Sequence, residues 1–224
     1  MKRSSKNSLL ALSALLTLVC APIVSAQSPP FYVNADLGGC VTMDTDLNGF
    51  FGPVAPGSKV KFDPGLRYGI TAGFQLTEWF ALEAELGGMS TEINEITDAN
   101  AVSAWFSSIP ILVNAKFQWK NASRFTPYVG VGVGGSASFL SMDFIELNGV
   151  GVTGDTSDFV FAAQALAGLR YNLNDRMSLA VEYRFLWTEN PSFEADFTSG
   201  LASDHISFGQ IESQSLSLAF NWRF

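Results

Sequence analysis

The amino-acid sequence predicts an all-β protein: an eight-stranded antiparallel transmembrane up-and-down β-barrel, preceded by a cleavable signal peptide. Apolar residues recur at every second position in eight separate runs. Each run has about ten residues, the length that a tilted strand needs to cross a bilayer. Short and long connections alternate between the runs, and the chain begins with a basic segment followed by an apolar one. Together these observations indicate an exported membrane barrel.

The N-terminal segment has the composition of a secretory signal peptide. Lys2, Arg3 and Lys6 precede the apolar run LLALSALLTLV, and Val24-Ser25-Ala26 forms a small-residue cleavage site. The run is short for a membrane-spanning helix, which needs ~20 residues. We therefore expect cleavage after Ala26, with a signal peptide over residues 1–26 and an outer-membrane β-barrel domain over residues 27–224.

The chain that remains after cleavage is acidic. Removal of the three basic residues of the signal peptide leaves 10 Lys and Arg against 21 Asp and Glu, a net charge of −11. Proteins that bind nucleic acid usually show the opposite balance, so we expect no nucleic-acid partner. Cys40 is the single cysteine left, which excludes an intramolecular disulfide.

The first four expected strands each carry a large apolar series and a small or polar series. In the first strand, Phe31, Val33 and Leu37 alternate with Asn34 and Asp36. The next three repeat the pattern, with Gly, Thr, Glu, Asn or Lys in the second series. The four segments are FYVNADLGGC (31–40), RYGITAGFQL (67–76), WFALEAELGG (79–88) and IPILVNAKFQW (109–119). A period of two predicts a strand whose two faces meet different surroundings.

The last four expected strands follow the same rule. Valine alternates with Gly130, Gly132 and Gly134 in the fifth, and the eighth ends on Trp222 and Phe224. The four segments are PYVGVGVGGSAS (127–138), FVFAAQALAGLRY (159–171), RMSLAVEYRFLW (176–187) and SLSLAFNWRF (215–224).

The connections alternate in length, which predicts an asymmetric barrel. Short turns lie near Thr77-Glu78, at KNASR and around LND. Membrane barrels of this type have short periplasmic turns and longer external loops. We therefore expect four external loops, at about residues 41–63, 90–106, 140–158 and 188–210.

Two assignments of the faces are open to an eight-stranded barrel. A soluble barrel of the lipocalin type turns its apolar face inward. Here the non-apolar face is crowded with small residues, which suit a narrow interior. Aromatic residues also gather near both ends of the expected strands, as in the two belts of a membrane barrel. These are Phe31, Trp79, Phe80, Trp119, Phe125, Tyr171, Trp222 and Phe224 at one end, and Tyr68, Phe139, Phe159 and Trp187 at the other.

Three stretches resemble the small eight-stranded outer-membrane β-barrel family, in the superfamily of the opacity-type and outer-membrane-protein-A-type barrels. They are TPYVGVGVGG (126–135), FAAQALAGLRYNLNDRMSLAVEYRF (161–185) and the terminal SLAFNWRF. The resemblance implies a bacterial outer-membrane location, contact with outer-membrane lipid, and recognition of Phe224 by the barrel-assembly machinery. Members of this family serve as structural anchors, adhesins or minor pores.

The inward series contains charges of both signs in nearly equal number. Such a set predicts a lumen that is filled by paired charges, because buried charges are tolerated when they are paired and hydrogen-bonded. The alternative is an ion pathway lined by the same residues. The expected luminal charge network consists of Asp36, Arg67, Glu83, Glu85, Lys116, Arg170, Glu182, Arg184 and Arg223.

Motifs for metal binding or catalysis are weak. Asp44, Asp46 and Asn48 match the first half of a calcium loop. The bidentate Glu that such a loop needs at its twelfth position is replaced by Ala55, so we expect a solvated acidic loop and no cofactor. His205 is the one histidine and has no second feature of a catalytic triad beside it. We expect no enzymatic activity.

The expected external loops are acidic, with interspersed apolar residues such as Phe50, Phe51, Trp105, Phe193 and Phe197. The sequence therefore favours a monomer with a structural or surface-interaction (adhesin-like) role through these loops, toward an extracellular ligand that it does not identify. The alternative is a narrow porin for small solutes or ions, with a gap beside the three glycines of the fifth strand.

Overall fold

The structure, a computed structural model, describes residues 31–50, 53–147, 150–195 and 204–224. The signal peptide expected at residues 1–26 lies outside the described residues. Within them the chain forms strands joined by turns, and no helix is long and apolar enough to cross a membrane.

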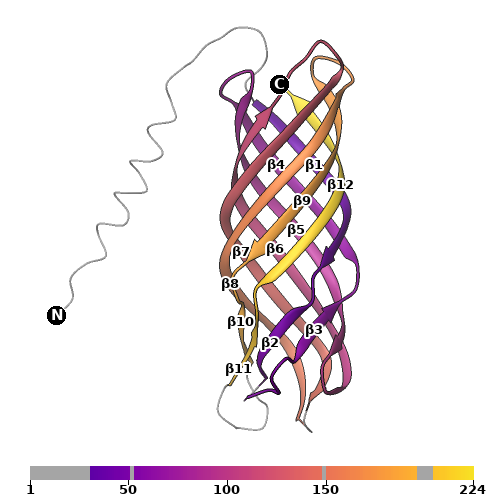
Figure 1. Ribbon diagram of the computed structural model, residues 1–224, viewed down its shortest axis with the longest axis vertical. Coiled ribbons are helices and arrows are strands. Elements are labelled where there is room, and N and C mark those ends of the chain that lie inside the picture. The colour runs from indigo at the N-terminus through magenta and orange to yellow at the C-terminus, as the bar shows by residue number, and fades with distance from the viewer. Residues whose placement is uncertain (1–30, 51–52, 148–149, 196–203) are drawn as a thin grey trace, which may run out of the picture.

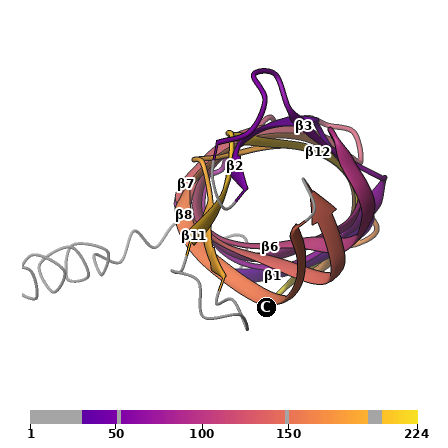
Figure 2. The same ribbon diagram turned by 90° about the horizontal axis from the view of Figure 1, so that it is seen from below.

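Eight strands form a closed antiparallel ring, which confirms the predicted barrel topology (Figure 1). The ring runs in the order β5-β4-β1-β12-β9-β8-β7-β6 and closes through the pairing of β5 with β6. Its strands are β1 (Phe31–Thr42), β4 (Gly65–Gln75), β5 (Phe80–Ile96), β6 (Ala99–Gln118), β7 (Phe125–Leu147), β8 (Val150–Asn172), β9 (Met177–Thr188) and β12 (Ile211–Arg223). The end-on view shows the ring around a central axis (Figure 2).

The first and last strands of the ring pair with each other along their whole length. Leu37 lies opposite Leu218 and Ala35 opposite Phe220. The Phe224 amide continues the ladder by donating to the Phe31 carbonyl oxygen at 3.2 Å. The ring thus has no unpaired edge, which a barrel in lipid requires because hydrocarbon cannot satisfy free N–H and C=O groups.

The apolar series of the ring faces outward and the small or polar series faces inward. Leu218 is 70% exposed and Ile70 is 60% exposed, while the intervening inward residues are buried. Two glycines make room for inward tyrosines from the neighbouring strand: a Cβ on Gly73 would lie 2.6 Å from Tyr32 Oη, and one on Gly168 2.8 Å from a ring carbon of Tyr128.

The four connections predicted as long loops contain strands, so that prediction was wrong. Most of residues 90–106 and 140–158 continue the ring strands β5, β6, β7 and β8. Residues 41–63 contain β2 (Thr45–Phe50) and β3 (Lys59–Phe62), and residues 188–210 contain β10 (Ser192–Ala195) and β11 (Asp204–Phe208). The described strands on this side pair in the order β10-β11-β2-β3-β5.

These segments extend the wall beyond the ring. They lie at the end of the barrel opposite the start of β1 and the end of β12 (Figure 1). We call this part the distal tier; it comprises β2, β3, β10, β11 and residues 91–106, 140–147 and 150–158. Its interior is a cluster of buried apolar side chains. The cluster consists of Leu47, Phe50, Val60, Phe62, Ile93, Ile96, Ala104, Phe106, Leu140, Met142, Ile145, Phe193, Ile206, Phe208 and Ile211.

The polarity of the wall reverses between the ring and the distal tier. In β5, Glu83 and Glu85 point into the lumen and Leu86 is 53% exposed. Further along the same strand, Ile93 is buried inside and Glu92 is exposed outside. The ring is therefore built for an apolar surrounding and the distal tier for water. This reversal explains the wrong loop prediction: the acidic outer series was taken as loop composition, although the period of two continues.

Candidate functional site

The lumen of the ring holds eight of the nine expected charged residues in one connected network; the exception is Arg223. Glu85 lies at its centre, where its carboxylate accepts hydrogen bonds from Arg67 Nη2 at 2.7 Å, Asn114 Nδ2 at 2.7 Å and Gln164 Nε2 at 2.6 Å. Arg184 Nη1 lies 3.7 Å from the same carboxylate. Four strands thus supply partners to one buried anion.

Arg184 joins this centre to two further carboxylates. Its Nη1 donates to Asp36 Oδ1 at 3.0 Å, and its Nη2 pairs with Glu182. Asp36 is also paired with Arg67, whose Nε lies 3.3 Å from Asp36 Oδ2. Opposite charges therefore alternate across the lumen, which offsets the cost of removing them from water.

A second cluster lies around Lys116. Its ammonium pairs with Glu83, which also accepts a hydrogen bond from the Tyr32 hydroxyl at 2.5 Å. The same ammonium lies 4.8 Å from the centroid of the Tyr32 ring and 5.2 Å from that of Tyr128. The Tyr128 hydroxyl donates to Glu182 at 2.8 Å, which links the two clusters.

Arg170 and Arg223 lie at the edge of this arrangement. Arg170 Nη1 donates to Gln118 Oε1 at 3.0 Å, and its guanidinium lies 5.3 Å from the Tyr128 ring centroid. Arg223 is half-buried, whereas the other eight residues of the expected network are buried.

Sequence reasoning missed four neutral members of the network that contact its carboxylates: Tyr32, Asn114, Tyr128 and Gln164. All four belong to the inward series and carry groups that hydrogen-bond to carboxylates. A usable signal was present, because Tyr32 pairs with Gly73 and Tyr128 with Gly168 in the ladder. An inward tyrosine opposite a glycine indicates that the tyrosine side chain lies over that glycine, along the inner surface of the barrel wall.

The three glycines of β7 do not leave a gap. A Cβ on Gly132 would lie 3.1 Å from Gln164 Cγ, and one on Gly130 would lie 3.1 Å from Leu166 Cδ1. The space above Gly130 and Gly132 is therefore filled by side chains of neighbouring strands, and Gly134 faces backbone atoms of β6, so the gap that the alternative porin role required is not found there.

Two more layers follow between the charged network and the distal tier. Cys40, Met89, Leu112, Ala162 and Leu186 form a small apolar cluster. Serine hydroxyls also pair inside the wall, as in the 2.7 Å contact between the Oγ atoms of Ser108 and Ser136. The apolar core of the distal tier then follows. Successive layers of ionic and apolar packing thus occupy the interior of the described barrel.

The calcium candidates lie on a strand, where a loop was expected. Asp44 precedes β2, and Asp46 and Asn48 lie on its outer face. Alternate residues of a strand are nearly 7 Å apart along the chain, so these groups do not converge as the ligands of a calcium loop do. No group of three or more His, Cys, Asp or Glu in the described part of the chain is arranged to hold a metal ion.

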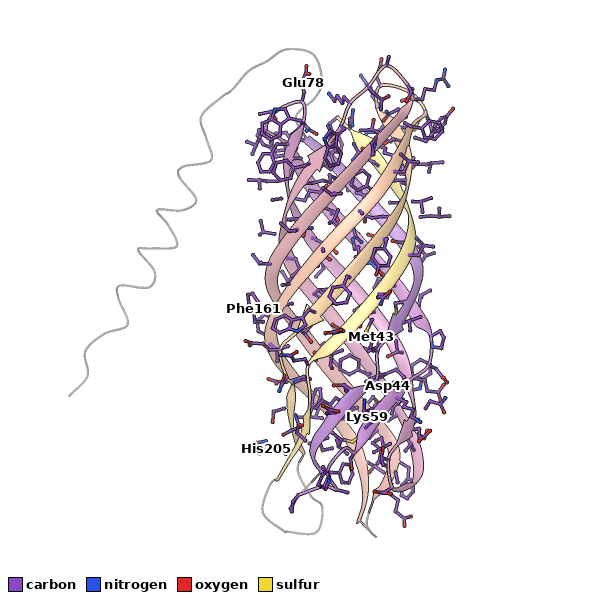
Figure 3. The ribbon with its side chains drawn as sticks, viewed as in Figure 1. Met43, Asp44, Lys59, Glu78, Phe161 and His205 are labelled. Atoms are coloured by element: carbon purple, nitrogen blue, oxygen red, sulfur yellow. The ribbon has the colours of Figure 1, made fainter. Side chains whose placement is uncertain are left out.

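The same residues line a polar groove of about 490 Å³ beside the junction of ring and distal tier. Met43, Asp44 and Lys59 are labelled in Figure 3, and Glu212 also contributes to the lining. His205 is exposed on β11, away from Asp44 in that view (Figure 3), and faces Glu194 of β10 in the ladder.

An exposed ion pair lies on the outer surface of the distal tier. Lys61 Nζ donates to Glu95 Oε2 at 2.9 Å, from β3 to β5. This hydrogen bond and the charge of Glu95 raise the pKa of Lys61. Both side chains are exposed, so the pair adds little to stability, and what it adds is lost as the pH rises through the raised pKa of Lys61.

Comparison with known proteins supports the fold. The sequence profile of the outer membrane protein beta-barrel domain matches residues 11–224. No curated protein sequence matches the chain.

Three solved outer-membrane structures are similar over nearly their whole length. Neisserial surface protein A has 16% identity and a TM-score of 0.53, covering 87% of this chain and 97% of its own. OprG from Pseudomonas aeruginosa has 10% identity and a TM-score of 0.58, covering 88% and 98%. AlkL has 16% identity and a TM-score of 0.56, covering 91% and 95%. At these identities the likeness concerns the fold alone.

Proposed function

Because the chain belongs to the outer membrane protein beta-barrel domain family, whose members lie in the bacterial outer membrane, we propose that it is a non-conducting barrel that presents the distal tier to the cell exterior as an interaction surface. This is an adhesin-like role. The observation that carries it is the apolar core of the distal tier, which continues the interior of the barrel beyond the charged lumen. Because the segments expected as loops pack around this core, they form a rigid body.

The packed interior supports the absence of conduction. An ion that enters from the terminal end meets Glu85 and Arg184, which are already paired and buried. It then meets two apolar clusters, where a bare ion has no partner to replace its hydration. The competing role as a narrow porin requires a continuous polar path through these layers.

The rigid distal tier supports the surface role. Phe193 and Phe208 pack edge to face, with ring centroids 5.5 Å apart. Ser192 N donates to Asp158 Oδ2 at 2.7 Å, which ties β10 to β8. A surface that is held in one conformation loses less entropy when a partner binds than a flexible loop does.

Conductance in planar bilayers tests the closed lumen. We expect the pure refolded protein to give no steady channels, while a pore-forming barrel reconstituted by the same procedure conducts. The variant Leu112→Ala opens only one layer, so we expect it to stay closed as well. Steady, reproducible channels from the wild-type protein would refute the proposal and favour the porin.

Labelling of intact cells tests which end faces outward. Lys59→Cys places a thiol on the exposed surface of the distal tier, and Glu78→Cys places one at the opposite end (Figure 3). A maleimide that does not cross membranes should label the first variant in intact cells and the second only after lysis. The wild-type protein is the control, because Cys40 is buried. The reverse labelling pattern would contradict the proposed orientation.

A further inference from the structure

One side of the distal tier carries acidic residues with no basic residue among them. This side is formed by the distal parts of β6, β7 and β8, and we call it the β6–β8 face. Residues 99–107, 139–147 and 150–159 contain no Lys, Arg or His. They contain Asp143, Glu146, Asp155 and Asp158.

The surface formed by β2 and β3 differs, because two acidic residues there have a lysine as neighbour. Lys61 pairs with Glu95 across β3 and β5, and Lys59 lies opposite Asp46 in the ladder between β2 and β3. Charges there offset one another locally. The β6–β8 face therefore has carboxylates with no Lys, Arg or His in the same strand segments, unlike the surface of β2 and β3.

Two aromatic side chains are exposed on this same face. Trp105 is 46% exposed and Phe144 is 41% exposed. Trp105 differs from the belt residue Phe159, which lies opposite Ala137, because its own ladder partners are Glu92 and Ser141. Trp105 pairs with Ser141, which pairs in turn with Asp155, so hydrophilic groups flank the indole. Binding surfaces are enriched in exposed aromatic residues of this kind.

The strand register places the ring and the carboxylates within reach of one short peptide segment. Trp105, Ser141 and Asp155 lie on three successive strands, so the outer two are roughly 10 Å apart at the backbone. Asp143 lies two residues along β7 from Ser141, a separation of about 7 Å.

Hydrogen bonds hold both carboxylates on the face. The Ser141 hydroxyl donates to Asp155 Oδ1 at 2.5 Å, and the Ser103 hydroxyl donates to Asp143 Oδ2 at 3.4 Å. Each carboxylate keeps further acceptor positions for an incoming donor.

We propose that the β6–β8 face binds a basic peptide segment of a partner protein, with an Arg or Lys side chain over the Trp105 ring and neighbouring cations paired with Asp143 and Asp155. A guanidinium stacks on an indole and forms forked hydrogen bonds with carboxylates, so one chemistry satisfies both features of the face. This inference rests on the proposed surface role and adds the chemical class of the partner to it.

The test uses the full-length protein in nanodiscs of uncharged lipid, with pentaarginine as the probe and pentaglutamate as the charge-reversed control. Calorimetry should show pentaarginine binding that weakens as salt is added, and no pentaglutamate binding. Trp105→Ala should weaken pentaarginine binding about two- to fivefold without changing the charge of the protein. Asp143→Asn with Asp155→Asn should weaken it further.

A matched pair of substitutions separates the β6–β8 face from general electrostatics. Asp44→Asn with Asp46→Asn removes the same number of charges from the β2 side of the tier, where both side chains are exposed, and should leave the affinity within twofold. Equal losses from the two pairs would overturn the proposal, as would an unchanged affinity in Trp105→Ala. Trp105-dependent binding of an uncharged oligosaccharide, with no binding of pentaarginine, would overturn it too. These results would leave the closed lumen and the orientation standing, since conductance and labelling test those separately.

Discussion

The ionic lumen makes a strong prediction for Arg184→Met. Arg184 is 2% exposed and contacts three carboxylates, on Asp36, Glu85 and Glu182. Methionine fills much of the same volume and removes the charge. The three carboxylates then lose one cation while they remain buried, so the protein should unfold more easily.

The remaining contacts set the size of the effect. Asp36 and Glu85 keep Arg67, at 3.3 and 2.7 Å, and Glu182 keeps the Tyr128 hydroxyl at 2.8 Å. Removal of one partner from a buried pair costs about 3–5 kcal/mol, and the partners that remain favour the lower end, about 3 kcal/mol. The double variant Glu182→Gln with Arg184→Met removes one charge of each sign. It should regain about 1–2 kcal/mol relative to the single variant.

Urea titration of protein refolded into lipid vesicles measures these differences, with tryptophan fluorescence as the probe. Lys61→Met is the matched control: it breaks an ion pair whose members are exposed, so the midpoint should not move. If Arg184→Met unfolds within about 0.5 kcal/mol of the wild type, the charged network does not hold the lumen together. A double variant no more stable than Arg184→Met would mean that the loss does not arise from the unpaired carboxylate of Glu182.

Three further predictions concern other parts of the chain. Phe208→Ala should remove about 3–5 kcal/mol from the distal tier, because Phe208 is 1% exposed; proteolysis should then cut the tier while the barrel keeps its heat-dependent shift on gels, and an uncut tier would contradict the core assignment. Gly132→Ala should lower the refolding yield, because its Cβ would overlap Asn114 Oδ1 and approach Gln164 Cγ to 3.1 Å, whereas Gly39→Ala should refold normally with the nearest atom at 3.8 Å; similar yields would contradict the close packing above Gly132. Phe224→Asp should refold almost normally in vitro, because a charge near the membrane interface costs about 0–1 kcal/mol, yet be strongly reduced in cells if the terminal aromatic is read during assembly; equal mild effects would contradict that reading.

The ring was predictable because its outer surroundings are uniform. The apolar series Leu216, Leu218, Phe220 and Trp222 is unbroken, so the alternation assigns every one of these residues to the same, outer face. The distal tier was not predictable by that rule, because water replaces lipid outside the wall. Phe50 and Phe193, which looked like apolar residues of loops, are buried core residues of the tier.

The candidate site was predictable in its charges but not in its pairing. Alternation alone assigns Glu85 and Arg184 to the lumen. Which anion meets which cation depends on the relative shift of neighbouring strands, and this shift is set by ladders between segments distant in sequence, such as β1 with β12. The role of Asn114 and Gln164 depends on the same shifts, since each comes from a different strand than the carboxylate it contacts.

The reversal of polarity along β5 also constrains the order of membrane translocation and folding. Once condensed, the tier has Glu92 and Glu95 outside and Ile93 inside, so its surface is hydrated. A body with a hydrated surface does not dissolve in hydrocarbon, because every carboxylate on it would lose its water. With the orientation proposed above, residues 41–63 and 188–210 must therefore cross the bilayer as unfolded chain. The core around Phe193 and Phe208 then forms on the far side, where water supplies the driving force. Translocation of these segments therefore precedes folding of the tier, and the folded tier prevents them from crossing back.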